Sequence, residues 1–309
     1  MSISSALDWR KTISIFLVIV FIVLGYEYIK KYWSEFSTLN VKNYWQLVAV
    51  GLLFLVNMAL RGLFFRVVLK SFAIQLGFLE SFHLSATTTM INFLLPVRAG
   101  AGFRAVYLKK VHQLPYSHFA SVMVALYILF IMMNTLIGLA ATIMIAYRHG
   151  TINYIVVGIM VLAFFFSAIL IFYAPSHRLP VLIFRKYSAK VVEGWRVIIG
   201  SKQILKAAFL VVAGFTISAA GGYYYAYQAL GMHADIAETI VLTTSQILSG
   251  LVSITPGSFG IQEVVGMYFS TAITATIAQT LAMLLVVRAV KTLVAIIFGV
   301  PGLLLLSNR

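Results

Sequence analysis

Ionisable side chains inside apolar stretches are the residues of this sequence best placed to do chemistry. Arg98 and Arg104 flank a proline–glycine interruption of one stretch, and Glu263 follows a second interruption. Arg288 and Lys291 stand three residues apart in the last apolar run, so they share one face of a helix. Placing a charged side chain at the centre of a bilayer costs at least about 2.5–3.5 kcal/mol. A functional role is therefore the first hypothesis for each of these five residues.

These charges predict a site for an anion. An arginine holds a phosphate through paired hydrogen bonds, which is the role we predict for Arg98 and Arg104. Glu263 is predicted to pair with Arg288 or Lys291 and to serve as a gate or a proton-linked counter-charge. Simpler alternatives stay open. The two arginines can anchor the chain at the cytoplasmic surface, and Glu263 can form a purely structural ion pair.

Composition excludes an ordinary soluble domain. Of the 309 residues, 61% are hydrophobic and 10% are charged, with a mean hydropathy of +0.99. A soluble domain carries roughly 25% charged residues. The net charge of +15 comes from basic residues that cluster between apolar runs, which fits cytoplasmic loops beside anionic headgroups rather than nucleic acid. The absence of cysteine excludes disulfides and thiolate chemistry.

Six apolar runs are long enough for membrane-spanning helices, which need about 20 residues. They are Thr12–Tyr28, Tyr44–Leu63, Ala120–Tyr147, Ile152–Tyr173, Ala207–Leu230 and Leu281–Leu306. No small-residue cleavage motif follows the first run, so we predict a retained first span rather than a signal peptide. The tyrosines at 223–225 and Tyr227, near the end of the fifth run, are predicted to form an interfacial aromatic belt.

Two further apolar stretches are interrupted by helix-breaking residues. They are Phe78–Leu108, with Pro96 and Gly100, and Ile236–Ile277, with Pro256, Gly257 and Gly260. Proline removes a backbone donor and clashes with the preceding turn. Unpaired backbone at membrane depth is tolerated only where protein or water covers it. We therefore predict two re-entrant or broken hairpins that these five residues shape. Ordinary kinks in spanning helices are the alternative.

Charge asymmetry predicts the orientation of the spans and hairpins. Basic residues before the first span place the N-terminus in the cytoplasm, and the loop expected after the second span, with Arg61 and Arg66, then lies on the same side. The loop at 231–238 carries two acids and neither lysine nor arginine, so it belongs outside. The first hairpin then enters from the cytoplasm and the second from the opposite side.

The two hairpins share the pattern Pro-x-x-x-Gly, about half a chain apart. Paired interrupted segments in two halves of a chain indicate an inverted-repeat transporter with a site near the bilayer midplane. We predict one integral-membrane domain, 1–309, with one hairpin in a first half at about 1–150 and the other in a second half at 207–309. The basic, amphipathic segment 175–206 between them is predicted to lie in the cytoplasmic interface, with a solvated linker as the alternative.

Around both hairpins the sequence resembles the lysylphosphatidylglycerol synthase transmembrane-region family. Residues 92–100, NFLLPVRAG, are similar to the first signature of that family, and residues 255–263, TPGSFGIQE, to its second, Pro-Gly-x-x-Gly-x-x-Glu. The resemblance covers nearly the whole chain in motif order, spacing and hydropathy. The family includes the flippase half of the bacterial multiple peptide resistance factor. The resemblance therefore implies movement of a lipid, or a lipid-linked anionic headgroup, between leaflets.

Two departures limit what the resemblance implies. Family members often carry an acid just after the glycine that matches Gly100, where this chain has Ala101 and Gly102. A carboxylate role in the first hairpin is therefore not carried over. The sequence ends at Arg309 without the soluble aminoacyl-transferase domain of the full-length resistance factor, so we expect no lipid aminoacylation.

The sequence thus predicts an all-α polytopic membrane protein with about six full spans and two opposed re-entrant or broken hairpins. Its predicted function is translocation of a lipid or lipid-linked anionic headgroup across the bacterial cytoplasmic membrane. The alternatives are a membrane-embedded lipid-modifying transferase and an accessory scaffold for an envelope enzyme. Because no hydrolase, zinc-protease or P-loop motif is found, we predict that the chain is not an enzyme.

The predicted substrate-site residues are Asn92, Arg98, Arg104, Glu263, Arg288 and Lys291. Membrane lipids, anionic or carrying a linked phosphate, are the predicted partners. We predict no nucleic-acid partner, no cofactor and no metal. A homo-oligomer and a partner enzyme of envelope synthesis stay open.

Overall fold

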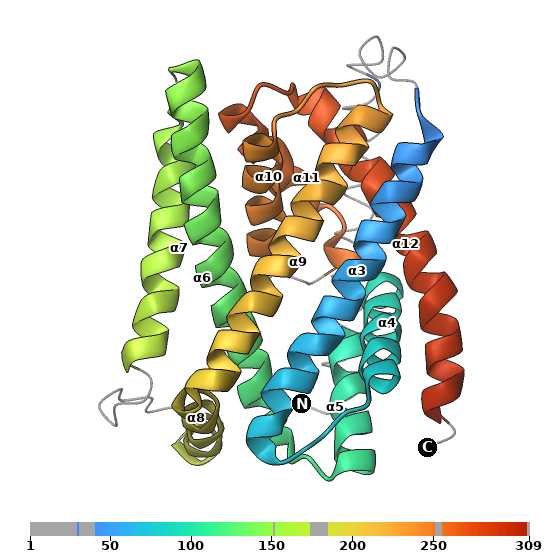
Figure 1. Ribbon diagram of the computed structural model, residues 1–309, viewed down its shortest axis with the longest axis vertical. Coiled ribbons are helices and arrows are strands. Elements are labelled where there is room, and N and C mark those ends of the chain that lie inside the picture. The colour runs from blue at the N-terminus through green and yellow to red at the C-terminus, as the bar shows by residue number, and fades with distance from the viewer. Residues whose placement is uncertain (1–29, 31–40, 151, 174–184, 251–254, 308–309) are drawn as a thin grey trace, which may run out of the picture.

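The computed structural model describes residues 30, 41–150, 152–173, 185–250 and 255–307, and every regular element in them is helical (Figure 1). The α-helices are α3 (Tyr44–Leu69), α4 (Phe78–Leu94), α5 (Ala99–His112), α6 (Tyr116–His149), α7 (Tyr154–Tyr173), α8 (Arg185–Gly200), α9 (Lys202–Ala229), α10 (Ile236–Ser249), α11 (Ile261–Phe269) and α12 (Ile277–Ser307). Short 3-10 turns are η1 (Lys70–Phe72), η2 (Pro256–Ser258) and η3 (Ser270–Ala272).

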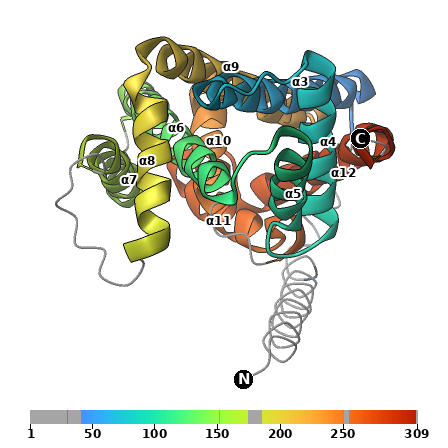
Figure 2. The same cartoon turned by 90° about the horizontal axis from the view of Figure 1, so that it is seen from below.

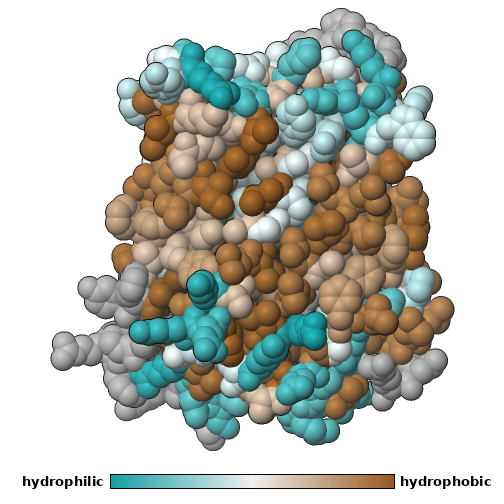
Figure 3. Space-filling view, in the orientation of Figure 1, coloured by the Kyte–Doolittle hydropathy of each residue, from teal (hydrophilic) through white to brown (hydrophobic). Residues whose placement is uncertain are grey.

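Five of these helices, α3, α6, α7, α9 and α12, are long and apolar enough to cross a bilayer. Their outer faces form a broad apolar belt between two polar ends (Figure 3). The belt and the helix lengths confirm the predicted all-α polytopic membrane fold. The first predicted span, Thr12–Tyr28, lies outside the described residues.

The two interrupted stretches fold as two short helix pairs, α4–α5 and α10–α11. The first pair occupies the lower half of the molecule and the second pair the upper half (Figure 1). Viewed along the long axis, α7 lies at one edge of the bundle and α12 at the other (Figure 2). α4 packs between α3 and α12, and α10 packs between α6 and α9. At the second break Thr255 and Ser258 are buried inside the bundle, whereas at the first break Leu95 and Val97 are about half exposed.

The two breaks have the same backbone conformation. Pro96 is followed by two residues in the left-handed region, Val97 at φ +55° and Arg98 at φ +53°. After Pro256, Gly257 at φ +57° and Ser258 at φ +54° repeat this conformation. A β-branched residue such as Val97 rarely adopts a positive φ, so the surrounding structure must hold it there. The shared turn is an internal repeat in the fold as well as in the sequence.

The two breaks also touch each other. A Cβ atom on Gly257 would lie 2.7 Å from Cδ1 of Phe93, so only glycine lets the second break approach α4 this closely. The guanidinium of Arg98 donates hydrogen bonds to the backbone carbonyl of Gly250 and to the hydroxyl of Tyr127. These contacts join α4, α5, α6 and α10 at the centre of the bundle.

Three expectations need correction or limits. α3 continues to Leu69, so Arg61 lies on the helix and not in a loop after it. Tyr223 and Tyr227 are 4% and 0% exposed, so they belong to the core and not to an aromatic belt. Within 175–206 the residues at 174–184 are not described, and the rest forms α8 and the start of α9.

α8 lies across the lower end of α6 (Figures 1 and 2). The hydroxyl of Ser121 on α6 donates a 2.8 Å hydrogen bond to the carbonyl of Val191. A Cβ atom on Gly194 would lie 2.4 Å from the same hydroxyl oxygen, which shows how closely the two helices approach. Within the part of α8 whose side chains are described, Lys190 and Glu193 are exposed and Trp195 is buried, as in an amphipathic helix.

Candidate functional site

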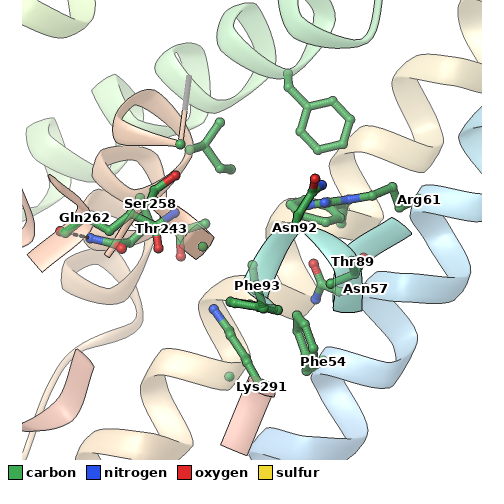
Figure 4. A pocket seen from close by; sticks show the side chains of 18 of the residues that line it. Phe54, Asn57, Arg61, Thr89, Asn92, Phe93, Thr243, Ser258, Gln262 and Lys291 are labelled. Atoms are coloured by element: carbon green, nitrogen blue, oxygen red, sulfur yellow. Dashed lines mark hydrogen bonds between the residues drawn. The ribbon is translucent and has the colours of Figure 1, made fainter. Parts of the chain in front are cut away.

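A cavity of about 270 Å³ lies at the centre of the bundle. Every described α-helix except α7 and α8 contributes to its wall, together with η2. Ser258 and Gln262 lie on one side of the space, and Asn57, Thr89 and Asn92 face them from the other (Figure 4). The two walls come from the second and the first helix pair, with α3 completing the first wall. The predicted hairpins therefore enclose the cavity.

The cavity gathers charges that are scattered along the sequence. Its ionisable lining residues include Arg61, Arg98, Arg104, Glu263, Arg288 and Lys291. Five of these six carry positive charge and one carries negative charge. The structure thus brings all five predicted charged site residues, and Asn92, into the lining of one cavity.

Glu263 is the only acid in the described lining, and it is 1% exposed. Its carboxylate accepts a 2.8 Å hydrogen bond from the backbone N–H of Gly260, which caps the start of α11. It also accepts a 2.6 Å bond from Nε of Arg288 on α12, as the sequence predicted. Gly260 holds φ +88°, a conformation that favours glycine. The Pro-Gly-x-x-Gly-x-x-Glu signature therefore specifies this turn, its cap and its ion pair.

The guanidinium of Arg288 donates most of its hydrogen bonds to residues at and just after the second break. Its two terminal nitrogens donate to the carbonyl of Gly257 at 3.1 Å and to the side-chain oxygen of Gln262 at 3.3 Å. The guanidinium carbon also lies 4.9 Å from the ring centre of Phe259. Together with Glu263, these contacts satisfy most donors of Arg288, so this part of the cavity is internally neutralised.

Lys291 lies one helical turn further along α12, and its ammonium group donates a 3.0 Å hydrogen bond to the hydroxyl of Tyr223. The same nitrogen is 4.5 Å from the ring centre of Tyr223 and 5.7 Å from that of Phe54. Cation–π contacts of this kind stabilise a desolvated ammonium. No carboxylate among the described residues pairs with Lys291.

The cations of the first helix pair and α3 have fewer partners. Arg104 is 3% exposed, with Nε bound to the hydroxyl of Thr88 at 3.1 Å and its guanidinium 3.9 Å from the ring centre of Phe65. One terminal nitrogen of Arg104, Nη2, has no hydrogen-bond partner among the described residues. Arg61 lies 5.3 Å from the ring centre of Phe215. Neither arginine faces a carboxylate within the described part of the chain.

Asn92 and Gly100 fix the first break. The side-chain oxygen of Asn92 accepts a 2.9 Å hydrogen bond from the backbone N–H of Gly100, near the start of α5. A Cβ atom on Gly100 would lie 2.1 Å from the carbonyl oxygen of Thr88, so α4 and α5 meet backbone to backbone there. This geometry explains the shaping role predicted for Gly100, and it gives Asn92 a structural task beside its predicted contact with substrate.

Arg61 is the cavity residue that the sequence analysis missed. It was assigned to a loop because a positive charge near the end of an apolar run usually marks a cytoplasmic anchor. The sequence does contain a pattern that could have identified Arg61. Asn57 stands four residues earlier, so the two polar side chains lie on one face of a spanning helix. Asn57 is 6% exposed and donates a 2.7 Å hydrogen bond to Ser218 of α9.

The described lining of the cavity is rich in hydrogen-bond donors and poor in groups that could act as catalytic acids or bases. Its single carboxylate is already engaged, so no carboxylate pair is arranged for acid–base work among the described residues. The described part of the chain also holds no group of three His, Asp or Glu side chains that could bind a metal. An excess of buried N–H donors suits an anion.

The fold and the cavity together define a class, namely an α-helical multi-pass membrane protein with a cationic cavity between two opposed helix pairs. The chain matches the family model described as the lysylphosphatidylglycerol synthase TM region over residues 11–299, so it belongs to that family. The matched range includes both signatures, which confirms the resemblance found in the sequence. A search of the curated proteins found no match.

Proposed function

We propose that this protein translocates a lipid, through its anionic headgroup, between the leaflets of the bacterial cytoplasmic membrane. The observation that carries the proposal is the charge of the central cavity, where five cationic side chains face one carboxylate. Buried charges are stable only when they are paired or solvated. An anionic headgroup supplies the missing counter-charge, which is why it enters an otherwise apolar bundle.

The size of the cavity supports a headgroup as the passenger. Sites that enclose drug-sized ligands measure roughly 300–1,000 Å³, whereas this cavity measures about 270 Å³. A phosphate-bearing headgroup fits that volume and a whole lipid does not. In this mechanism the acyl chains stay in the bilayer while the headgroup moves between the two helix pairs.

Glu263 is the gate in this mechanism. The carboxylate of Glu263 already accepts a 2.6 Å hydrogen bond from Nε of Arg288. A phosphate that approaches Arg288 therefore competes with Glu263 for the guanidinium. The close contact of Phe93 with Gly257 is the steric part of the same gate, because it closes the space between the two breaks. Movement of the α10–α11 pair away from both α4 and α12 would open the two contacts together, as in transporters built from two repeats.

Orientation follows from the distribution of charge. The C-terminal ends of α3 and α5 lie toward the end of the molecule that carries α8 (Figure 1). The basic residues there are Arg66 in the last turn of α3, Lys70 in η1, and Lys109 and Lys110 in the last turn of α5. By the positive-inside rule this end faces the cytoplasm, and so does the N-terminus. The α4–α5 pair then opens from the cytoplasm and the α10–α11 pair from the outer face, as re-entrant hairpins.

The experiment is leaflet exchange of fluorescent phospholipids in liposomes that contain the purified protein. Wild type is compared with Arg98→Ala and Glu263→Gln, and with Arg66→Ala as a matched control, because Arg66 lies on α3 outside the cavity lining. We expect exchange above empty liposomes in wild type and in Arg66→Ala, and a loss of roughly tenfold or more in the two cavity variants, the effect of one charge-assisted contact.

A lack of exchange with every anionic and neutral headgroup, in folded protein, would overturn the proposal. The transferase and the scaffold would then be the remaining hypotheses. Of these, the scaffold predicts no headgroup-sized space between the hairpins, and the cavity described above is such a space.

A further inference from the structure

The cationic residues of the cavity divide into two groups that differ in their partners. Arg288 and Lys291, both on α12, are held by Glu263, Gln262 and Tyr223. Arg61, Arg98 and Arg104 come from α3, the first break and α5, and we call them the arginine trio. Among the described residues no carboxylate pairs with any member of the trio. Of the four cavity cations that no described carboxylate pairs with, three therefore belong to the trio and the fourth is Lys291.

The three guanidinium groups have donors to spare. The structure gives Arg61 no hydrogen bond to a described residue, and its guanidinium carbon lies 5.3 Å from the ring centre of Phe215. Arg104 uses Nε but leaves Nη2 buried without a partner. Arg98 donates only to neutral oxygens, those of Tyr127 and Gly250. Each guanidinium carries five N–H donors, so most donors of Arg61 await an acceptor.

The trio also holds like charges close together. Arg61 lies near enough to Arg98 and to Arg104 for their charges to repel one another. Three guanidiniums that line one cavity are unfavourable there without an anion. One phosphodiester carries a single charge and two free oxygens, which satisfy one paired contact with one arginine. A terminal phosphate carries about −1.5 to −2 charges at pH 7 and three acceptor oxygens.

We propose that the arginine trio is a subsite for a terminal phosphate of a lipid, a phosphate monoester or a diphosphate, in preference to the phosphodiester of an ordinary phospholipid. This inference rests on the proposed function and narrows its substrate class. The three guanidiniums line one cavity, and none of them pairs with a carboxylate of the described residues, so they match a group that offers three or more oxygens and more than one charge. Tyr127, which already contacts Arg98, completes the polar surroundings.

The test compares binding of dioctanoyl phosphatidic acid and dioctanoyl phosphatidylglycerol to the purified protein in detergent by calorimetry. At pH 8 we expect phosphatidic acid to bind roughly tenfold or more tightly, because it gains at least one more charge-assisted contact. At pH 5 the preference should shrink, since the second proton of a phosphate monoester binds with a pKa of about 6. Equal affinities at pH 8, or a preference that does not change with pH, would overturn the inference.

Variants locate the subsite. Arg61→Gln is expected to reduce the preference for phosphatidic acid roughly tenfold while phosphatidylglycerol binding changes little. Arg61→Lys should keep part of the preference, and Arg66→Gln, on the same helix outside the cavity, should keep all of it. Equal weakening of both lipids by Arg61→Gln would count against a phosphate subsite. If pyrophosphate binds to the protein and phosphatidic acid does not, the subsite takes a free anion and the lipid assignment is overturned.

Leaflet exchange separates this inference from the proposed function. Faster exchange of a fluorescent phosphatidic acid than of a fluorescent phosphatidylglycerol supports both. Equal exchange of the two lipids leaves the proposed function standing and overturns only the phosphate preference. Exchange of neither lipid, nor of any other headgroup, overturns the proposed function itself.

Discussion

The carboxylate of Glu263 accepts hydrogen bonds from two directions, the backbone N–H of Gly260 and the guanidinium of Arg288. The first bond caps a helix and the second neutralises a buried charge. Removal of one partner from a buried pair is strongly destabilising because it leaves an unpaired charge behind. At the scale of single residues the stability of the second break and its charge balance therefore depend on the same side chain.

Glu263→Gln keeps an oxygen for the Gly260 N–H and removes the charge that faces Arg288. We expect it to destabilise the protein by roughly 3–5 kcal/mol, the usual effect of breaking a buried pair. Arg288→Gln should cost a similar amount, and the double variant should lie closer to wild type than either single variant. The measurement is the apparent thermal unfolding midpoint in detergent. Additive effects in the double variant would show that the two side chains do not stabilise each other.

The sequence predicted this pair because two opposite charges at membrane depth each need a partner. It did not predict Arg61, since hydropathy does not tell which face a charged residue takes near the end of a span. It also misplaced Tyr223, because a tyrosine at the end of a span looks the same in sequence whether it faces lipid or an ammonium inside the bundle. Only the packing of α3, α9 and α12 distinguishes these cases.

At the scale of elements, helices α4 and α5 are joined by a backbone contact. The N–H of Gly100 binds the side chain of Asn92, and the Thr88 carbonyl fills the space where a side chain at position 100 would stand. Gly102, two residues later, meets nothing within 4 Å and is exposed. Packing therefore requires glycine at position 100 of α5 and not at position 102, so the second position serves as a control for the first.

Gly100→Ala should push α5 away from α4 and lower the stability by about 1–3 kcal/mol, as expected for overpacking. Gly102→Ala should leave stability unchanged or raise it by up to about 1 kcal/mol, because alanine favours a helix over glycine. Thermal unfolding of both variants in detergent checks this. Equal unfolding midpoints for the two variants would mean that the close approach of α4 and α5 at Gly100 does not contribute to stability.

Much of the element level could be predicted from the sequence. Hydropathy over about 20 residues located all five described spans, because the cost of exposing polar backbone in lipid leaves only helices. The breaks at Pro96 and Pro256 were also predicted, since proline cannot continue the helical bonding. The left-handed backbone at Val97 could not be predicted, because local preference opposes it and only tertiary contacts impose it.

At the scale of the whole molecule, the two helix pairs come from different halves of the chain. The two breaks meet at the cavity. The last turns of α3 and α5, which carry Arg66, Lys109 and Lys110, lie at the same end of the molecule as α8 (Figure 1). At the other end Arg148 forms an ion pair with Asp235. If each pair enters and leaves the bilayer on one side, the turns that flank it must share that side. This consequence distinguishes re-entrant hairpins from kinked spans.

Because the chain has no cysteine, single cysteines can report on this arrangement directly. Gln75 and Tyr116 are exposed and flank the α4–α5 pair, and His233 and Thr274 are exposed and flank the α10–α11 pair. We expect a membrane-impermeant maleimide to label cysteine at 75 and 116 only in inside-out vesicles, and at 233 and 274 only in right-side-out vesicles. Detergent-opened vesicles, in which all four must react, are the control. Labelling of 75 and 116 from opposite sides would show that α4 and α5 cross the bilayer as one kinked span, and the cavity would then need a different route for the headgroup.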